Sequence, residues 1–244
     1  MIYVNGDSWS QKSGTLVDYS WPNILQETLG CLVENQSAGC GSNSRILSNL
    51  YKTYQSGVRP NLIIIALTSF QRWHFPSKCG SSWSIGPTVI NDRYNNHDQT
   101  ILNWWQRNVF DEVEFVYQYY NQIWQMHELS TKYFECPIIF FNAWDPYIAQ
   151  IHQHIYYNNI QEWLKLNLSD MDDYATIDYI KSFEFFKNEM AQWNHYIDYP
   201  WINFLTGHID DSTGLHPNHP SPNGHRLICK HVTSIIKEKI PTIY

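Results

Sequence analysis

Three short apolar runs along the chain predict buried β-strands: Met1 to Val4, Leu62 to Leu67 and Pro137 to Phe141. Each run is dense in β-branched or aromatic residues and is bounded by polar or turn residues. Such runs are typical of strands that are covered on both faces in a parallel sheet. A weaker strand candidate lies near Cys31 to Glu34.

Helical patterns fill the intervals between these runs. A helix over Trp21 to Leu29 is supported by Pro22 early in the segment and by Gly30 just after it. The other predicted helices cover Ser44 to Tyr54, Val109 to Phe134 and Pro222 to Lys239. Strands that alternate with helices predict an α/β fold, in which an open, mainly parallel sheet carries helices on both faces.

Two segments interrupt this alternation. Residues 70 to 108 are rich in tryptophan and asparagine and are too long for a plain connection, so we interpret them as an insertion. Residues 143 to 215 show little periodicity and predict mixed short helices with many aromatic residues. No composition shift marks a domain boundary, and a length of 244 residues fits a single domain over residues 1 to 244.

Composition and charge limit the classes of partner. Hydrophobic residues make up 43% of the chain and charged residues 16%, which predicts a folded globular protein. The net charge is −7 and no run of lysine or arginine could follow a phosphate backbone, so we expect no nucleic-acid partner.

The apolar runs also bear on membranes and on location. None approaches the roughly 20 residues that a membrane-spanning helix needs, so we expect no membrane partner. Residues 1 to 5 have the pattern of a core strand, with no basic segment before an apolar stretch, which predicts no signal peptide and a cytoplasmic protein at synthesis. The 5 cysteines are scattered, without a pair at zinc-ligand spacing.

Polar loops follow the predicted strands and supply the candidate chemistry. Asn5 to Ser8 follows the first predicted strand. Ala66 to Ser69 lies at the carboxyl end of the strand predicted at Leu62 to Leu67. Ligands of open α/β sheets bind at the carboxyl ends of the strands, where these loops should meet. The loop at 35 to 43, rich in small residues, precedes a helix and offers backbone N–H groups to an anion. Ser8 is therefore a candidate nucleophile as well as an ordinary turn residue.

A serine becomes a nucleophile only when a base accepts its proton, and a neutral imidazole is the usual base near neutral pH. Three of the 11 histidines, His216, His219 and His225, precede or begin the last predicted helix. A loop that leads into the final helix of such a fold can reach the strand ends, which would bring a histidine to Ser8.

These motifs together resemble the SGNH (GDSL) hydrolases. The resemblance rests on Gly6-Asp7-Ser8 after the first strand, the Gly/Ser/Asn loop at 39 to 43, and His219-Pro220 followed by Gly224-His225. It follows the order of the chain over its whole length, although the motifs occupy about a tenth of it. The chain is also similar to phage-encoded members of this superfamily in two places, the Ser69 to Arg72 stretch and the tryptophan-rich insertion. If the chain is phage-encoded, we expect it to be associated with the virion.

The resemblance implies a flavodoxin-like three-layer α/β/α sandwich and a serine esterase that needs neither metal nor another cofactor. Ser8 would be the nucleophile, with its own N–H in the oxyanion hole. His219 would be the base. The glycine of the second motif falls best on Gly41, with Gly39 as the alternative register.

The third family motif is altered here. Its asparagine, which donates to the oxyanion, corresponds to Thr68. A threonine hydroxyl can donate a single hydrogen bond, but it is shorter than an amide and can rotate to act as an acceptor. Thr68, Ser69 or Arg72 could take the place of the asparagine, and Arg72 would suit an anionic substrate.

The acid that normally orients the catalytic histidine is also replaced. The family aspartate lies three residues before the histidine, where this chain has His216. An imidazole there cannot supply the negative charge that stabilises an imidazolium. Either Asp211 or Asp210 fills this role from upstream, or a backbone carbonyl orients His219 in a Ser-His dyad.

Metal chemistry is a weaker interpretation of the histidines. Two sets of histidines could suggest a metal site: His152 with His154, and His208 with His216, His219 and His225. Neither set has a carboxylate or cysteine partner at ligand spacing. Asp170 to Asp173 lacks the glycine and terminal glutamate of a calcium loop and is better read as a solvated acidic turn or helix start.

The resulting hypothesis is a serine esterase that cleaves a small-molecule or glycan ester through an acyl-enzyme, with a carbohydrate O-deacetylase as one form. An acyltransferase would use the same residues. A glycan- or protein-binding module on a degenerated SGNH scaffold is the alternative outside catalysis, because two motifs are altered and aromatic residues reach 16%.

Overall fold

The computed structural model describes residues 1–11, 20–39, 41–69, 72–76, 82–85, 112–143, 173–190, 192–193, 196–197, 201, 205, 207–210 and 219–241. Its main sheet has the strand order β2-β1-β3-β6-β7, and every neighbouring pair is parallel. In that order the strands are β2 (Val33–Asn35), β1 (Ile2–Asn5), β3 (Leu62–Leu67), β6 (Ile138–Asn142) and β7 (Tyr196–Ile197).

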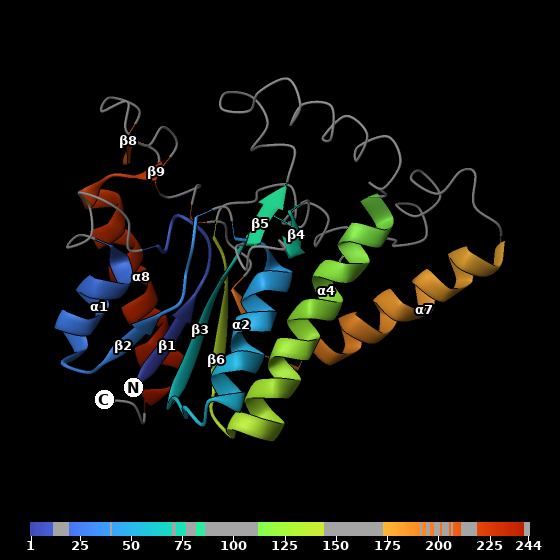
Figure 1. Ribbon diagram of the computed structural model, residues 1–244, viewed down its shortest axis with the longest axis horizontal. Helices are drawn as coiled ribbons and strands as arrows, with labels where there is room; N and C mark the ends of the chain where they lie inside the picture. The colour runs from blue at the N-terminus through green and yellow to red at the C-terminus, as the bar shows by residue number, and fades with distance from the viewer. Residues whose placement is uncertain are drawn as a thin grey trace.

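Helices cover both faces of this sheet (Figure 1). α1 (Trp21–Leu29) and α8 (Pro222–Lys239) pack together on one face. α2 (Asn43–Gln55) and α4 (Glu112–Leu129) pack together on the other, and α7 (Asp173–Met190) lies against α4. The fold is therefore the predicted α/β/α arrangement with a parallel sheet in the middle.

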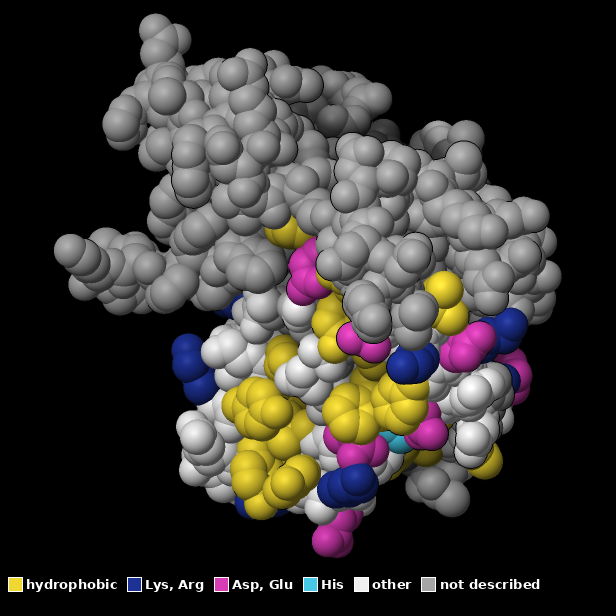
Figure 2. Space-filling model, turned by 90° about the vertical axis from the view of Figure 1, so that its right-hand side faces the viewer, with side chains coloured by type: hydrophobic (Ala, Val, Ile, Leu, Met, Phe, Trp, Pro, Cys, Tyr) yellow, Lys and Arg dark blue, Asp and Glu magenta, His cyan; other side chains and the backbone are white. Residues whose placement is uncertain are grey.

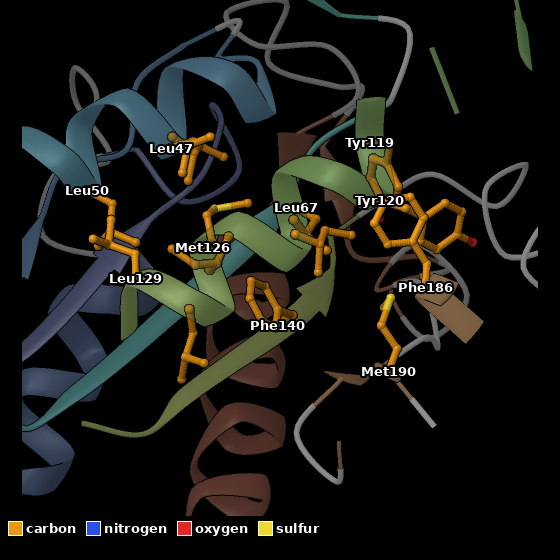
Figure 3. Close-up of a cluster of buried hydrophobic side chains, with 14 of the residues drawn as sticks. Leu47, Leu50, Leu67, Tyr119, Tyr120, Met126, Leu129, Phe140, Phe186 and Met190 are labelled. Carbon is orange, nitrogen blue, oxygen red and sulfur yellow. The ribbon is translucent and has the colours of Figure 1, made fainter. Parts of the chain in front are cut away.

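Successive residues of each strand feed two separate cores, because side chains alternate between the faces of a sheet. Ile2 and Val4 join the core under α1 and α8, whereas Tyr3 joins the core under α2, α4 and α7. Figure 3 shows the second core, in which Leu47, Met126 and Phe140 meet between the helices and the sheet. Burial on both faces explains why the strands appear in the sequence as continuous apolar runs.

Most predicted elements are confirmed, with ends that differ by a residue or two. The helices at Trp21–Leu29 and Pro222–Lys239 and the strand at Leu62–Leu67 have the predicted bounds. The long pattern that ends at Phe134 is α4 followed by a π-helical turn, Ser130–Phe134. The weak strand candidate is β2, which starts later than predicted.

The prediction for the second insertion is wrong over residues 173–190. Mixed short helices are predicted there, whereas α7 is a single helix of 18 residues. Its pattern was hard to see because Phe183 and Phe186 are buried while Phe185 is exposed, so aromatic residues occupy both its inner and its outer face.

The first insertion contains a hairpin, β4 (Trp73–Pro76) paired antiparallel with β5 (Ser82–Ile85). A second antiparallel pair joins β8 (Ile209–Asp210) to β9 (His219–Pro220) just before α8. Residues 77–81 and 86–108 of the first insertion, and residues 144–172 of the second, lie outside the described residues. Among the helices that the structure describes, none has the length and apolar character to span a bilayer.

Candidate active site

The polar loops after the central strands meet at one edge of the sheet. Parallel pairing sets Asn5 of β1 beside Ile65 of β3, and Leu67 of β3 beside Asn142 of β6. The backbone therefore leaves β1 and β3 at neighbouring points. A Cβ added to Gly6 would lie 2.9 Å from the Cβ of Ala66, so only glycine lets the first turn approach β3 this closely.

The turn after β1 is held by Asp7. Its buried carboxylate accepts a hydrogen bond from the backbone N–H of Trp9 at 2.9 Å, and its carbonyl oxygen accepts from the N–H of Ser10 at 3.1 Å. Ser8, between them, is partly buried. Within the described part of the chain neither its hydroxyl nor its N–H makes a hydrogen bond. The turn is thus fixed by its neighbours while Ser8 stays available.

Arg72 forms a buried ion pair with Asp7. Its Nη1 lies 2.9 Å from Asp7 Oδ2, and the two side chains are 9% and 0% exposed. The same nitrogen lies 3.4 Å from the carbonyl oxygen of Gly41. Arg72, predicted as one of three residues that could replace the family asparagine, is placed by these contacts between the turn after β1 and the loop before α2.

Thr68 is held through its backbone and its side chain. The side chain of Asn43 accepts from the Thr68 N–H at 3.0 Å and donates to the Thr68 carbonyl oxygen at 2.9 Å. The Thr68 hydroxyl donates to Asp7 Oδ2 at 3.4 Å. In this arrangement the hydroxyl hydrogen points at Asp7, so it must rotate before it can donate to an oxyanion.

Gly41 lies in a turn in which its own N–H donates to the carbonyl oxygen of Ala38 at 3.0 Å. A Cβ at Gly41 would be 3.1 Å from the carbonyl oxygen of Gly6, which is tighter than an ordinary contact. The loop before α2 therefore lies against the turn after β1, as predicted. Gly39, the alternative residue, is exposed in the same loop.

His219 lies in β9, partly buried, directly before α8. The structure shows no hydrogen bond between it and Ser8 among the described contacts. Its backbone is paired with Asp210 across the β8–β9 ladder. Asp211 and His216 lie outside the described residues, as do His152 and His154.

An electrostatic interaction followed by two hydrogen bonds links His219 to the turn after β1. The pKa of His225 is lowered to about 4, mainly by burial of its side chain and secondarily by the nearby His219. Neutral His225 accepts a hydrogen bond at Nδ1 from the Trp21 N–H at 3.3 Å. The Trp21 indole in turn donates to the hydroxyl of Ser10 at 3.1 Å.

Three residues of this site were missed as contributors: Asp7, Asn43 and His225. Asp7 and Asn43 stand inside the quoted motifs, but their partners Arg72 and Thr68 are 65 and 25 positions away. No local pattern signals such pairs. His225 lies in the first turn of α8, and its contact with Trp21 joins segments 204 positions apart.

No set of three or more His, Cys, Asp or Glu side chains that could hold a metal ion occurs within the ranges that the structure describes. The donors gathered at the strand ends are a serine, a threonine, backbone amides and arginines. This set suits an oxyanion or an ester better than a cation.

Comparison with known proteins rests on structure alone, because no family model and no curated sequence matches the chain. The chain is similar to TesA, with 14% identity and a TM-score of 0.50 over 97% of this chain and 98% of that one. It is also similar to the psychrotrophic esterase EstA from Pseudoalteromonas, with 14% identity and a TM-score of 0.51 over 97% and 96% of the two chains.

The fold is SGNH-hydrolase-like. A member of the lipolytic G-D-S-L family from Veillonella parvula also matches, with 15% identity and a TM-score of 0.49 over 98% of this chain and 97% of that one. The likeness to the SGNH/GDSL fold extends over nearly the whole chain. At such identities it concerns the fold, and the chemistry of the site has to be argued from its residues.

Proposed function

We propose that this protein is a serine esterase that cleaves an ester through an acyl-enzyme on Ser8. The observation that carries the proposal is the turn after β1. Asp7 and Ser10 are held by hydrogen bonds on either side of Ser8, whose hydroxyl is left without a partner among the described residues. The turn lies at the carboxyl edge of a parallel sheet, where α/β folds bind ligands.

In the proposed reaction the Ser8 hydroxyl oxygen attacks the acyl carbon, and its proton passes to His219. The carbonyl oxygen becomes an oxyanion, to which the Ser8 N–H donates. The ester bond breaks when His219 returns the proton to the leaving alcohol. Water then attacks the acyl-enzyme by the same route, which releases the acid and restores Ser8.

Two steps of rearrangement belong to this proposal. Gly41 N–H joins the oxyanion hole only after it leaves the Ala38 carbonyl, and the Thr68 hydroxyl only after it turns from Asp7. Catalytic hydrogen bonds commonly form only in the substrate complex. The orienting group for His219 is proposed as Asp211 or Asp210, because β8 delivers this part of the chain to β9.

The substrate is proposed to be a small-molecule or glycan ester, with an acetylated carbohydrate as the first class to test. The described loops at the strand-end edge contain small and polar residues, with Ser8 partly buried and Gly39 exposed. A polar edge suits the hydroxyl groups of a sugar better than a long alkyl chain.

The test is covalent labelling with a fluorophosphonate probe, followed by peptide mapping. We expect a single adduct on Ser8, and loss of labelling in Ser8→Ala. Ser37→Ala, which changes another serine in the loops at this sheet edge, is the matched control and should be labelled as the wild type is. Folded wild-type protein without an adduct on Ser8 would refute the proposed nucleophile.

A binding module without catalysis is the second candidate, favoured by the internal use of the Gly41 N–H and the Thr68 hydroxyl. The face over α4 and α7 carries gathered hydrophobic side chains (Figure 2). A groove between α2 and the end of α4 is lined by Tyr51 and Tyr133, 43% and 57% exposed, together with Trp124. If wild type and Ser8→Ala hydrolyse short nitrophenyl esters equally while a glycan array shows tight binding, this candidate replaces the esterase.

A further inference from the structure

Arg45 approaches Gly41 from the first turn of α2. Its Nη1 lies 3.7 Å from the position that a Cβ on Gly41 would occupy. This nitrogen is buried and has no hydrogen-bond partner. A buried guanidinium N–H without an acceptor costs free energy, because it has lost water and gained nothing in return.

Arg45 differs in its ion pairing from the other arginine beside Gly41. The positive charge of Arg72 is matched by the carboxylate of Asp7 at 2.9 Å. No ion pair of Arg45 is found with any residue in the described ranges. The cluster of Asp7, Arg72 and Arg45 therefore carries one excess positive charge, in a chain whose net charge is −7.

The polar groups near Arg45 do not remove this excess. Tyr3, which interacts with it electrostatically, stays neutral because burial raises its pKa to about 12. Glu34, whose charge acts on Tyr3, accepts a hydrogen bond from the side chain of Gln36 at 2.8 Å and forms no ion pair with Arg45. Burial also lowers the pKa of Arg45, as expected for a cation without a counter-ion.

The place of Arg45 in its helix adds to the cost. It is the third residue of α2, and the first turn contains no acidic residue. A positive side chain in a first turn is opposed by the partial positive charge of the helix N-terminus. A negatively charged ligand at this point would offset both charges.

We propose that Arg45 binds an anionic group of the substrate, so that the preferred ester carries a carboxylate close to the scissile bond. This inference rests on the proposed function for its location, because Gly41 stands between Arg45 and the turn of Ser8. The anionic group can belong to the acyl part, as in a dicarboxylic monoester, or to the alcohol part, as in the ester of an acidic sugar.

The experiment compares matched pairs of esters. For the acyl side, the pair is the 4-methylumbelliferyl esters of butyric acid and of succinic acid as the monoester; for the alcohol side, phenyl acetate and 3-carboxyphenyl acetate. One charge-assisted hydrogen bond is equivalent to roughly 10- to 100-fold in kcat/KM. We expect kcat/KM to be higher by this factor for the anionic ester of one pair. The pair that shows the preference tells whether the anionic group belongs to the acyl part or to the alcohol part of the substrate.

Variants assign the preference to Arg45. In Arg45→Gln the ratio of kcat/KM between anionic and neutral esters should fall to near one, and in Arg45→Lys it should be intermediate. Arg59→Gln is the matched control, since Arg59 lies over the ring of Tyr54 at the far end of α2 and should keep the wild-type ratio. A wild-type ratio near one in both pairs, or an unchanged ratio in Arg45→Gln, overturns the inference.

A binding measurement separates this inference from the proposed function. Ser8→Ala is titrated by calorimetry with the succinate monoester and with the butyrate ester. Arg45-dependent preference for the monoester supports the anion site even if the wild-type protein hydrolyses neither ester. Hydrolysis of both esters at equal rates supports the esterase and refutes the anion site.

Discussion

Acidification should destabilise the protein through His225, which is 5% exposed. Its pKa is lowered in the folded protein from 6.5 to about 4, mainly by burial and secondarily by His219. The unfolded chain therefore takes up a proton first as the pH falls. Stability is complete above pH 6.5, is lost as the pH falls toward about 4, and then levels off. One pKa unit corresponds to about 1.4 kcal/mol, so the loss approaches about 3 kcal/mol.

Urea unfolding at about pH 7.5 and about pH 4.5 measures this loss. Other groups also titrate in this range; the pKa values of His127 and His231 are lowered in the same direction. The matched variant is His225→Asn, whose side-chain oxygen can still accept from the Trp21 N–H. Those other groups contribute to both proteins and cancel in the comparison.

We expect the free energy of unfolding of the wild type to fall between these pH values by about 2–3 kcal/mol more than that of His225→Asn. A fall of equal size in both proteins would refute the reasoning. It would mean that His225 takes up its proton in the folded state as readily as in the unfolded state.

Three further substitutions test the contacts at the strand ends. Arg72→Met should lower the free energy of unfolding by about 3–5 kcal/mol in urea titrations, because it leaves the buried Asp7 carboxylate unpaired; the double variant with Asp7→Asn should recover part of this, and no recovery would contradict the ion-pair argument. Asn43→Ala should cost about 2–4 kcal/mol by thermal or urea unfolding, since the Thr68 N–H and carbonyl lose their partners; a cost below about 1 kcal/mol would show that water or another group replaces Asn43. Gly6→Ala should cost about 1–3 kcal/mol because its methyl group would lie 2.9 Å from a side-chain atom of β3; unchanged stability would show that the turn can move away.

Much of the fold could be predicted from local patterns. Leu62–Leu67 and Pro222–Lys239 have the bounds expected from an apolar run and from a proline start, because burial and capping depend on nearby residues. α7 could not be predicted as one helix, since Phe185 faces outward beside two inward phenylalanines. β7 has only 2 residues, too few for any pattern.

The sequence by itself determined that a parallel sheet forms and that Ser8 follows its first strand, because strand runs and turn residues are local properties. Only the tertiary structure decided how the charges at the sheet edge are matched. Arg72 neutralises Asp7, whereas Arg45 remains without a counter-ion in the described chain. The physical reason is that ion pairs and buried hydrogen bonds depend on distances of a few ångströms between segments far apart in the chain, and these distances exist only once the strands have paired.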